Sequence, residues 1–314
     1  ALRNVPGTAA ARAVLIERAT KYLDELSSEG TPALAGEAGS GWLRLAILQN
    51  ETAQGSTGQP DIAKRNFERA ITLLHRAMED AAAPDSVRVD WMRAQRLLAV
   101  QHATSGRISE ATTAFSDAVA SATRLASTPG ASVRVRMEAA AVLAARAFYL
   151  RPDNASSRRR ARDDAAHARM LLDSVARDAL TDAERQRLDD YRIYFFGTLS
   201  AVANTNDAGV VDAAQQLIWA REGLAIAEAR MKTSPDRLSF QDETATALLD
   251  VTAAADAAGD GAQRRTLLHV QAGQPLQAQL AGHAQRRRQR ATVGVQPLHQ
   301  RRDDVEVDGP GRQQ

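Results

Sequence analysis

The feature that most constrains the fold is a repeated spacing of small and large apolar residues. Ala111, Phe115 and Ala118 stand at i, i+4 and i+7, so in an α-helix they form one stripe with a ring between two small side chains. The same spacing recurs at Ala63-x3-Phe67-x2-Ala70 and at Ala220-x3-Leu224-x2-Ala227. A second helix can approach closely over the alanines while the large side chain fills the space between them. The stripe therefore predicts closely packed helices, with the central residue of each stripe in the core.

Turn and capping residues divide the rest of the chain into helical segments. Thr181-x2-Glu184 is a capping box, which predicts the start of a helix. Only 4% of the residues are aromatic, and the abundance of alanine favours helices over strands. The predicted breaks are Thr31-Pro32, Gly55–Pro60, Ala82–Asp85, Gly106, Thr128–Gly130, Arg151–Asn154, Asn204–Gly209, Ser234–Asp236 and Gly259–Gly261.

Residues 90–123 contain one complete two-helix unit, with a turn at Gly106 and the apolar stripe on the second helix. This arrangement is typical of the tetratricopeptide repeat (TPR), a helical hairpin of about 34 residues. We therefore predict an all-α, TPR-like helical-hairpin solenoid of about five hairpins over residues 1–261. Within residues 157–176, Arg169 takes the place of the large apolar residue, so we expect that repeat to be degenerate.

The composition changes after residue 261. Residues 262–314 are rich in Gln, Arg and His, contain three of the six histidines, and have no amphipathic stripe that would end a repeat array. We expect this low-complexity tail to be disordered or poorly structured, or to be the translation of a shifted reading frame of a GC-rich gene.

Composition also excludes several kinds of function. The chain has no cysteine, which rules out disulfides, thiolate metal sites and cysteine nucleophiles. The formal net charge is only +2, so we expect no nucleic-acid binding. No apolar run reaches the roughly 18 residues of a membrane span. Because the sequence begins at Ala1 without a leader, we interpret it as a fragment of a longer protein.

No catalytic, cofactor or metal site is predicted. His75, His102 and His167 stand alone, whereas metal ligation needs converging donors. Asp163-Asp164 and Asp189-Asp190 are expected to be solvated, and the arginines of residues 158–162 to pair locally with Asp163 and Asp164. There is no phosphate-binding loop and no kinase or hydrolase motif. We therefore expect the chain not to be an enzyme and to need no cofactor.

The first helices of a TPR array line its concave groove. In the unit of residues 90–123 the groove positions are Arg93, Arg96, Val100 and Thr104. Two arginines there would suit a carboxylate of a protein or peptide partner, because the guanidinium group binds carboxylates in a bidentate way. The alternative interpretation is an ordinary solvated helix face.

One stretch resembles a known family. Leu2–Arg12, the pattern Leu15-x-Glu17-Arg18-Ala19-x2-Tyr22-Leu23 and the segment Trp42–Leu45 resemble the start of the C-terminal TPR region of bacterial serine/threonine protein kinases. The resemblance implies a sensor or scaffold module, cytoplasmic or tethered to the membrane through an upstream segment, whose catalytic domain lies outside this chain. The alternative is a regulatory helical domain of a TPR-containing transcriptional activator. An enzyme built on helical hairpins is a remote third reading. The partner and the oligomeric state stay open.

Overall fold

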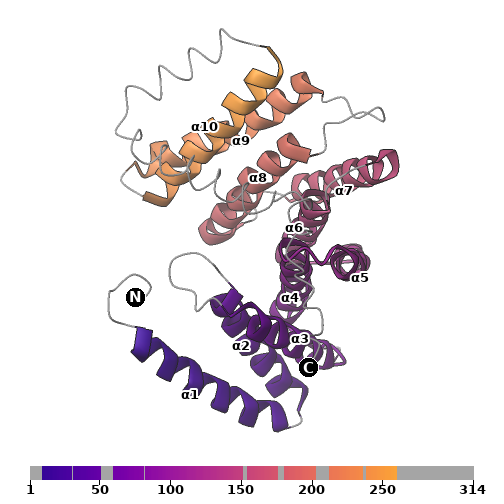
Figure 1. Ribbon diagram of the computed structural model, residues 1–314, viewed down its shortest axis with the longest axis vertical. Helices are drawn as coiled ribbons and strands as arrows, with labels where there is room; N and C mark the ends of the chain where they lie inside the picture. The colour runs from indigo at the N-terminus through magenta and orange to yellow at the C-terminus, as the bar shows by residue number, and fades with distance from the viewer. Residues whose placement is uncertain are drawn as a thin grey trace, which may run out of the picture. The chain divides into compact units, whose positions relative to one another are not determined.

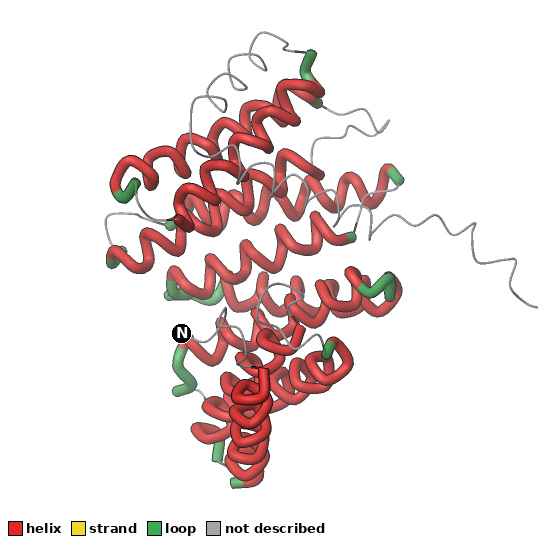
Figure 2. The backbone as a smooth tube through the Cα atoms, turned by 60° about the vertical axis from the view of Figure 1, so that its left-hand side comes forward, coloured by secondary structure: helices red, strands yellow, loops and turns green. Residues whose placement is uncertain are grey.

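The computed structural model describes residues 9–29, 31–50, 59–80, 82–150, 154–175, 180–202, 212–235 and 238–259. These residues form an all-α structure, with no strand among them (Figures 1 and 2). The helices are α1 (Ala9–Ser28), α2 (Pro32–Asn50), α3 (Pro60–Ala77), α4 (Asp85–Thr104), α5 (Ile108–Ala126), α6 (Val133–Tyr149), α7 (Ala155–Asp173), α8 (Asp182–Val202), α9 (Ala213–Thr233) and α10 (Leu238–Ala257).

Contacts within the chain separate Ala1–Arg265 from Thr266–Gln314, and every described residue belongs to the first unit. The expectation of a disordered or frameshifted tail over residues 262–314 therefore concerns residues outside those that the structure describes. The same holds for the loops predicted at residues 55–58 and 204–209 and for residues 2–8, where the predicted family resemblance begins.

Local signals explain where several helices begin and end. The predicted capping box is confirmed: the Thr181 backbone N–H donates to Glu184 Oε2 at 3.1 Å, and the Glu184 N–H donates to Thr181 Oγ1 at 3.3 Å. Asn154 forms a similar reciprocal cap with Ser157 at the start of α7. After α4 the backbone of Gly106 has a φ of 74°, a conformation that glycine adopts without steric cost.

The packing follows a regular order. Each helix packs on the next one, and α2, α4, α6, α8 and α10 also contact one another in sequence, as α2 with α4 and α4 with α6. As a result α3, α5, α7 and α9 each lie against two even-numbered helices. This order of contacts recurs from α2 to α10.

The apolar stripes form the core between these helices. Phe67 of α3 and Phe115 of α5 are fully buried, and so are the alanines on either side of each ring. Leu224 of α9 is also buried, so the predicted core position of all three large residues is confirmed. On α7 the corresponding residue Arg169 is partly exposed and forms ion pairs with Asp173 and with Glu222 of α9.

Helices α2 and α3 approach each other especially closely. A Cβ atom built on Gly39 of α2 would lie 2.7 Å from Leu74 Cγ and 3.0 Å from the Leu74 backbone nitrogen. The first distance is shorter than real Cβ contacts and the second is tight, so a side chain at Gly39 would require Leu74 or the helices to shift. The two helices are also joined by a buried hydrogen bond of 2.6 Å from Asn66 Nδ2 to Gln49 Oε1.

Candidate functional site

The four residues predicted for the groove lie in different environments on α4. Arg93 is exposed and has no ion pair among the described residues. Arg96 is only 16% exposed and forms an ion pair with a neighbouring helix. Val100 is half-buried against the core around Phe115, and Thr104 donates a hydrogen bond to the Val100 carbonyl of its own helix. Of the four, only Arg93 presents an uncommitted charged side chain.

The partner of Arg96 is a buried carboxylate. Arg96 Nε lies 2.9 Å from Oε1 of Glu138 on α6, whose side chain is 2% exposed. The second carboxylate oxygen, Oε2, accepts a hydrogen bond of 2.6 Å from the Tyr191 hydroxyl of α8. The three side chains therefore join three consecutive even-numbered helices. We call this set the polar network: Arg96, Glu138 and Tyr191.

The electrostatics of the polar network favour one protonation state. Burial raises the pKa of the Tyr191 phenol well above its usual value, and the negative charge of Glu138 raises it further. The phenol therefore stays protonated and donates to the carboxylate. A buried carboxylate is costly unless it is paired and hydrogen-bonded, and Glu138 has both kinds of partner. The arrangement links helices and leaves no group of the network poised for acid–base chemistry.

Sequence reasoning did not identify Glu138 or Tyr191. A signal was present for Glu138, because it is the single acidic residue in an otherwise apolar run from Met137 to Ala145. An isolated carboxylate on a helix with so little polar surface must find a buried partner. No comparable signal marks Tyr191, since a tyrosine at this spacing is also consistent with simple core packing.

The expectation that both members of each acidic pair are solvated holds for Asp163 and Asp190, which are exposed, but is wrong for Asp164 and Asp189. Asp164 of α7 is buried, and its carboxylate binds Arg146 of α6 in a bidentate way, with distances of 2.7 and 2.6 Å. Asp189 of α8 is buried as well. The expected local pairing of the α7 arginines with Asp164 is therefore replaced by a pair between helices. The reason is that Asp164 lies on the face of α7 that packs on α6.

A further buried cation lies between α8, α9 and α10. Arg230 of α9 is 2.6 Å from Asp190 of α8 and 2.9 Å from Glu243 of α10, and its guanidinium lies 4.3 Å from the ring centre of Phe240. The guanidinium thus lies close to two carboxylates and to the face of an aromatic ring. This cluster links three consecutive helices.

The described residues contain no group of acidic and histidine side chains that could hold a metal ion. His102 is buried near the end of α4, and its Nδ1 has no hydrogen-bond partner. Burial lowers the pKa of His102, and the positive charges of Arg107 and Lys64 lower it further, against smaller opposing effects of Glu110 and Glu68. His102 is therefore an uncharged residue of the interior near neutral pH.

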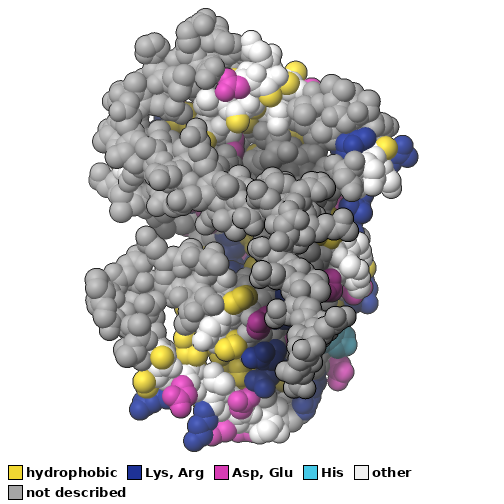
Figure 3. Space-filling view, in the orientation of Figure 1, with side chains coloured by type: hydrophobic (Ala, Val, Ile, Leu, Met, Phe, Trp, Pro, Cys, Tyr) yellow, Lys and Arg dark blue, Asp and Glu magenta, His cyan; other side chains and the backbone are white. Residues whose placement is uncertain are grey.

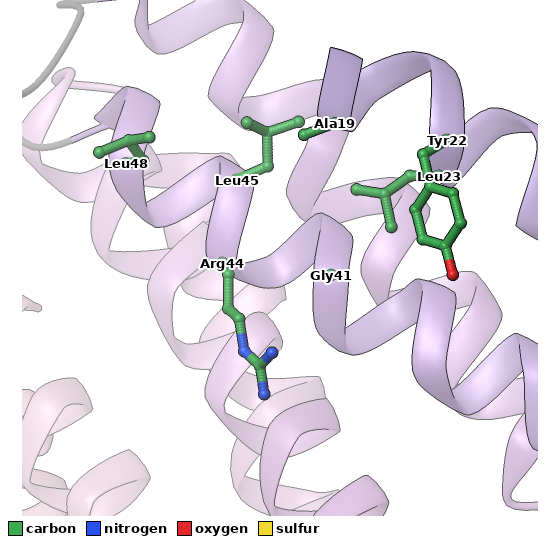
Figure 4. Close-up of a pocket in the computed structure, with 7 residues that line it drawn as sticks. All are labelled: Ala19, Tyr22, Leu23, Gly41, Arg44, Leu45 and Leu48. Carbon is green, nitrogen blue, oxygen red and sulfur yellow. The ribbon is translucent and has the colours of Figure 1, made fainter. Parts of the chain in front are cut away.

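An apolar groove lies between α1 and α2. It has a volume of about 290 Å³ and is lined by Ala19, Tyr22 and Leu23 of α1 and by Gly41, Arg44, Leu45 and Leu48 of α2 (Figure 4). Hydrophobic side chains gather on this part of the surface, at the lower left of Figure 3. The helical period puts Leu15, Ala19, Tyr22 and Leu26 on one stripe of α1, and of these Leu26 is buried whereas Leu15 is 54% exposed and Tyr22 57% exposed. The first part of that stripe is therefore uncovered.

Comparison with known proteins adds no identification. No family model matches the chain, and no curated protein matches its sequence. Among the described residues, no helix combines the length and the apolar character needed to cross a membrane.

Proposed function

We propose that the helices of residues 9–259 form a TPR-like solenoid that serves as a protein-interaction module. The contact order supports the proposal: each odd-numbered helix from α3 onward packs between two even-numbered helices, and the even-numbered helices contact one another in sequence. In stacked helical hairpins the first helices of successive repeats contact each other in this way. In the proposed array α2, α4, α6, α8 and α10 are these first helices and provide the binding face.

Within the binding face, Arg93 is the residue proposed to bind a partner. It lies one helical turn from Arg96 on α4, but its guanidinium is exposed and unpaired among the described residues. The positive charge of Arg93 lowers the pKa of Tyr191, an effect smaller than the opposing effect of burial. Arg96 and Glu138 neutralise each other. The polar network therefore orients α4, and Arg93 contributes the charge that attracts a carboxylate of a protein or peptide.

The observation that carries this proposal is the difference between Arg96 and Arg93. Arg96 forms an ion pair with Glu138, whereas Arg93 is exposed. This difference narrows the predicted groove set of Arg93, Arg96, Val100 and Thr104 to a single contact residue. The other three would act indirectly, through the position of α4.

Affinity capture with the full chain tests the proposed site. The wild type, Arg93→Ala and Arg124→Ala serve as baits in a lysate of the encoding organism, and the recovered proteins are identified by mass spectrometry. Arg124 is also an exposed arginine, on the odd-numbered helix α5, and is the matched control. We expect the wild type and Arg124→Ala to recover the same partner of the binding face. Its dissociation constant for Arg93→Ala is expected to rise about tenfold, as for loss of a charge-assisted hydrogen bond. Equal affinity of all three baits would contradict the role of Arg93.

The resemblance of residues 1 to about 75 to the C-terminal TPR region of bacterial serine/threonine protein kinases supports a more specific proposal, a sensor or scaffold region attached to a kinase. Sequencing the gene upstream tests it directly. A kinase domain in the same reading frame is the expected result, and a DNA-binding domain there would instead favour a transcriptional activator.

A further inference from the structure

Helix α1 differs from the other odd-numbered helices in what covers it. Helices α3, α5, α7 and α9 each pack against two even-numbered helices, whereas the main contact of α1 is with α2 alone. On α1 the apolar residues Val14, Leu15 and Tyr22 are exposed, and Tyr22 also lines the groove with α2. Single exposed apolar residues are normal, but a contiguous apolar surface beside a groove marks an interaction site.

The groove between α1 and α2 has the form of a helix-binding surface. Its floor is narrow because α1 and α2 touch at Gly41, where an added Cβ atom would meet Leu23 Cδ2. Its walls are the aliphatic side chains of Leu45 and Leu48 and the ring of Tyr22. Six of the seven lining residues carry no charge, and Arg44 is the only charged one (Figure 4).

The next surface along the chain shows what such a groove accepts. There α2 itself packs against both α3 and α4. Its small residues make the contact: a Cβ atom on Gly36 would lie 3.2 Å from Val87 Cγ2, and Ser40 donates a hydrogen bond of 2.6 Å to Asp90. A helix with a stripe of small residues and a polar contact at the edge therefore fits between an odd-numbered helix and the even-numbered helix that follows it.

We propose that the groove between α1 and α2 binds an amphipathic helix of a partner protein. The stripe of small and aliphatic residues on that helix packs on Tyr22, Leu45 and Leu48, and an acidic residue beside the stripe pairs with Arg44. This mode of recognition uses apolar residues at i, i+3, i+4 and i+7 of the bound helix as anchors. Helix binding in this groove does not require Arg93. It can therefore be tested independently of the proposed carboxylate binding by Arg93.

Charge favours an acidic partner helix over a second copy of this chain. Arg44 is exposed and has no ion pair among the described residues. A two-fold contact centred on the groove would bring two Arg44 guanidinium groups together, and like charges at an interface are unfavourable. An acidic side chain supplied by a partner removes this conflict.

Fluorescence anisotropy of two designed peptides tests the proposal with the full chain. Both peptides are labelled amphipathic helices of about five turns with an alanine–leucine stripe. One carries glutamate beside the stripe, and the other carries lysine at the same position. We expect micromolar binding of the glutamate peptide and at least about tenfold weaker binding of the lysine peptide. Arg44→Glu is expected to reverse this preference.

Two further variants locate the bound peptide. Tyr22→Ser removes an apolar anchor at the groove and is expected to weaken binding about fivefold or more. Ile108→Ser removes a similarly exposed apolar residue from α5, far along the chain, and is the matched control. Circular dichroism shows whether each variant keeps its helices. Arg93→Ala is expected to bind both peptides as the wild type does.

Three results would overturn the proposal. The first is no change of anisotropy up to about 1 mM protein, and the second is an unchanged peptide preference in Arg44→Glu. The third is a dimer in sedimentation velocity that Tyr22→Ser dissociates, because a second copy would then occupy the groove.

Discussion

Arg96 of α4 and Glu138 of α6 form an ion pair of 2.9 Å between residues 42 positions apart in the sequence. Arg96 was predicted to bind a partner, but in the structure it joins α4 to α6. The second oxygen of Glu138 extends the connection to Tyr191 of α8. The polar network thus spans three even-numbered helices, and its loss is expected to affect stability more than binding.

Removing Arg96 alone should be strongly destabilising. Arg96→Ala leaves the Glu138 carboxylate buried without its cation, and we expect a loss of about 3 kcal/mol, at the lower end for broken buried pairs because Arg96 keeps some contact with water. Urea denaturation followed by circular dichroism measures the loss. The double variant Arg96→Met/Glu138→Met removes both charges and should be more stable than Arg96→Ala. If Arg96→Met/Glu138→Met is less stable than Arg96→Ala, the instability of Arg96→Ala does not come from an unpaired Glu138 carboxylate.

The ring of Phe115 should be a main source of stability for the α4–α5 unit. Phe115→Ala opens a cavity among fully buried neighbours, and we expect a loss of about 3–5 kcal/mol. Ile108→Ala on the same helix removes an exposed side chain and should change stability by less than about 0.5 kcal/mol. Thermal unfolding of the two variants in parallel checks the contrast. Similar effects at both positions would show that Phe115 is not buried as described.

The two small positions of α2 should respond to alanine in a fixed order. Gly39→Ala places a Cβ atom 2.7 Å from Leu74 Cγ, whereas Gly36→Ala places one 3.2 Å from Val87 Cγ2. Alanine raises helix propensity by about 1 kcal/mol at either site, and overpacking costs about 1–3 kcal/mol. We therefore expect Gly39→Ala to be destabilising and Gly36→Ala to be milder. Urea midpoints provide the comparison, and the reverse order would contradict the close approach at Leu74.

His102 should make the fold sensitive to mild acid. The pKa of His102 is lowered in the folded state, mainly by burial, from its ordinary value of 6.5. The unfolded chain therefore binds a proton more readily, and stability is lost as the pH falls from 6.5 towards the lower pKa of the folded state. His102→Gln removes this contribution, so its stability should fall less than that of the wild type between pH 7 and about pH 5. Equal slopes for the two proteins would exclude His102 as a source of the pH dependence.

Much of the secondary structure follows from short-range patterns. The stripe Ala111-x3-Phe115-x2-Ala118 depends on residues seven positions apart, and both the helix and its buried face could be predicted from it. The capping box at Thr181 could be predicted for the same reason, since cap and backbone lie within one turn. The helix period and the capping hydrogen bonds are local properties of the chain.

The predicted groove illustrates what a local pattern leaves open. The helical period places Arg93 and Arg96 one turn apart on α4, but it does not state which of them meets a carboxylate. That depends on how α6 packs against α4, and Glu138 then selects Arg96. The burial of Asp164 could not be predicted for the same reason, because its partner Arg146 belongs to another helix.

By itself, the sequence determined that this chain forms a succession of amphipathic helices and which large residues enter their core, because these properties are encoded within one or two helical turns. Only the tertiary structure decided which charged side chains form ion pairs between helices and which remain exposed. Tyr191 and Glu138 are 53 residues apart, and Arg44 has no ion pair among the described residues. The physical reason is that the energy of a charge depends on its burial and on its nearest neighbours, and both are set by packing between helices.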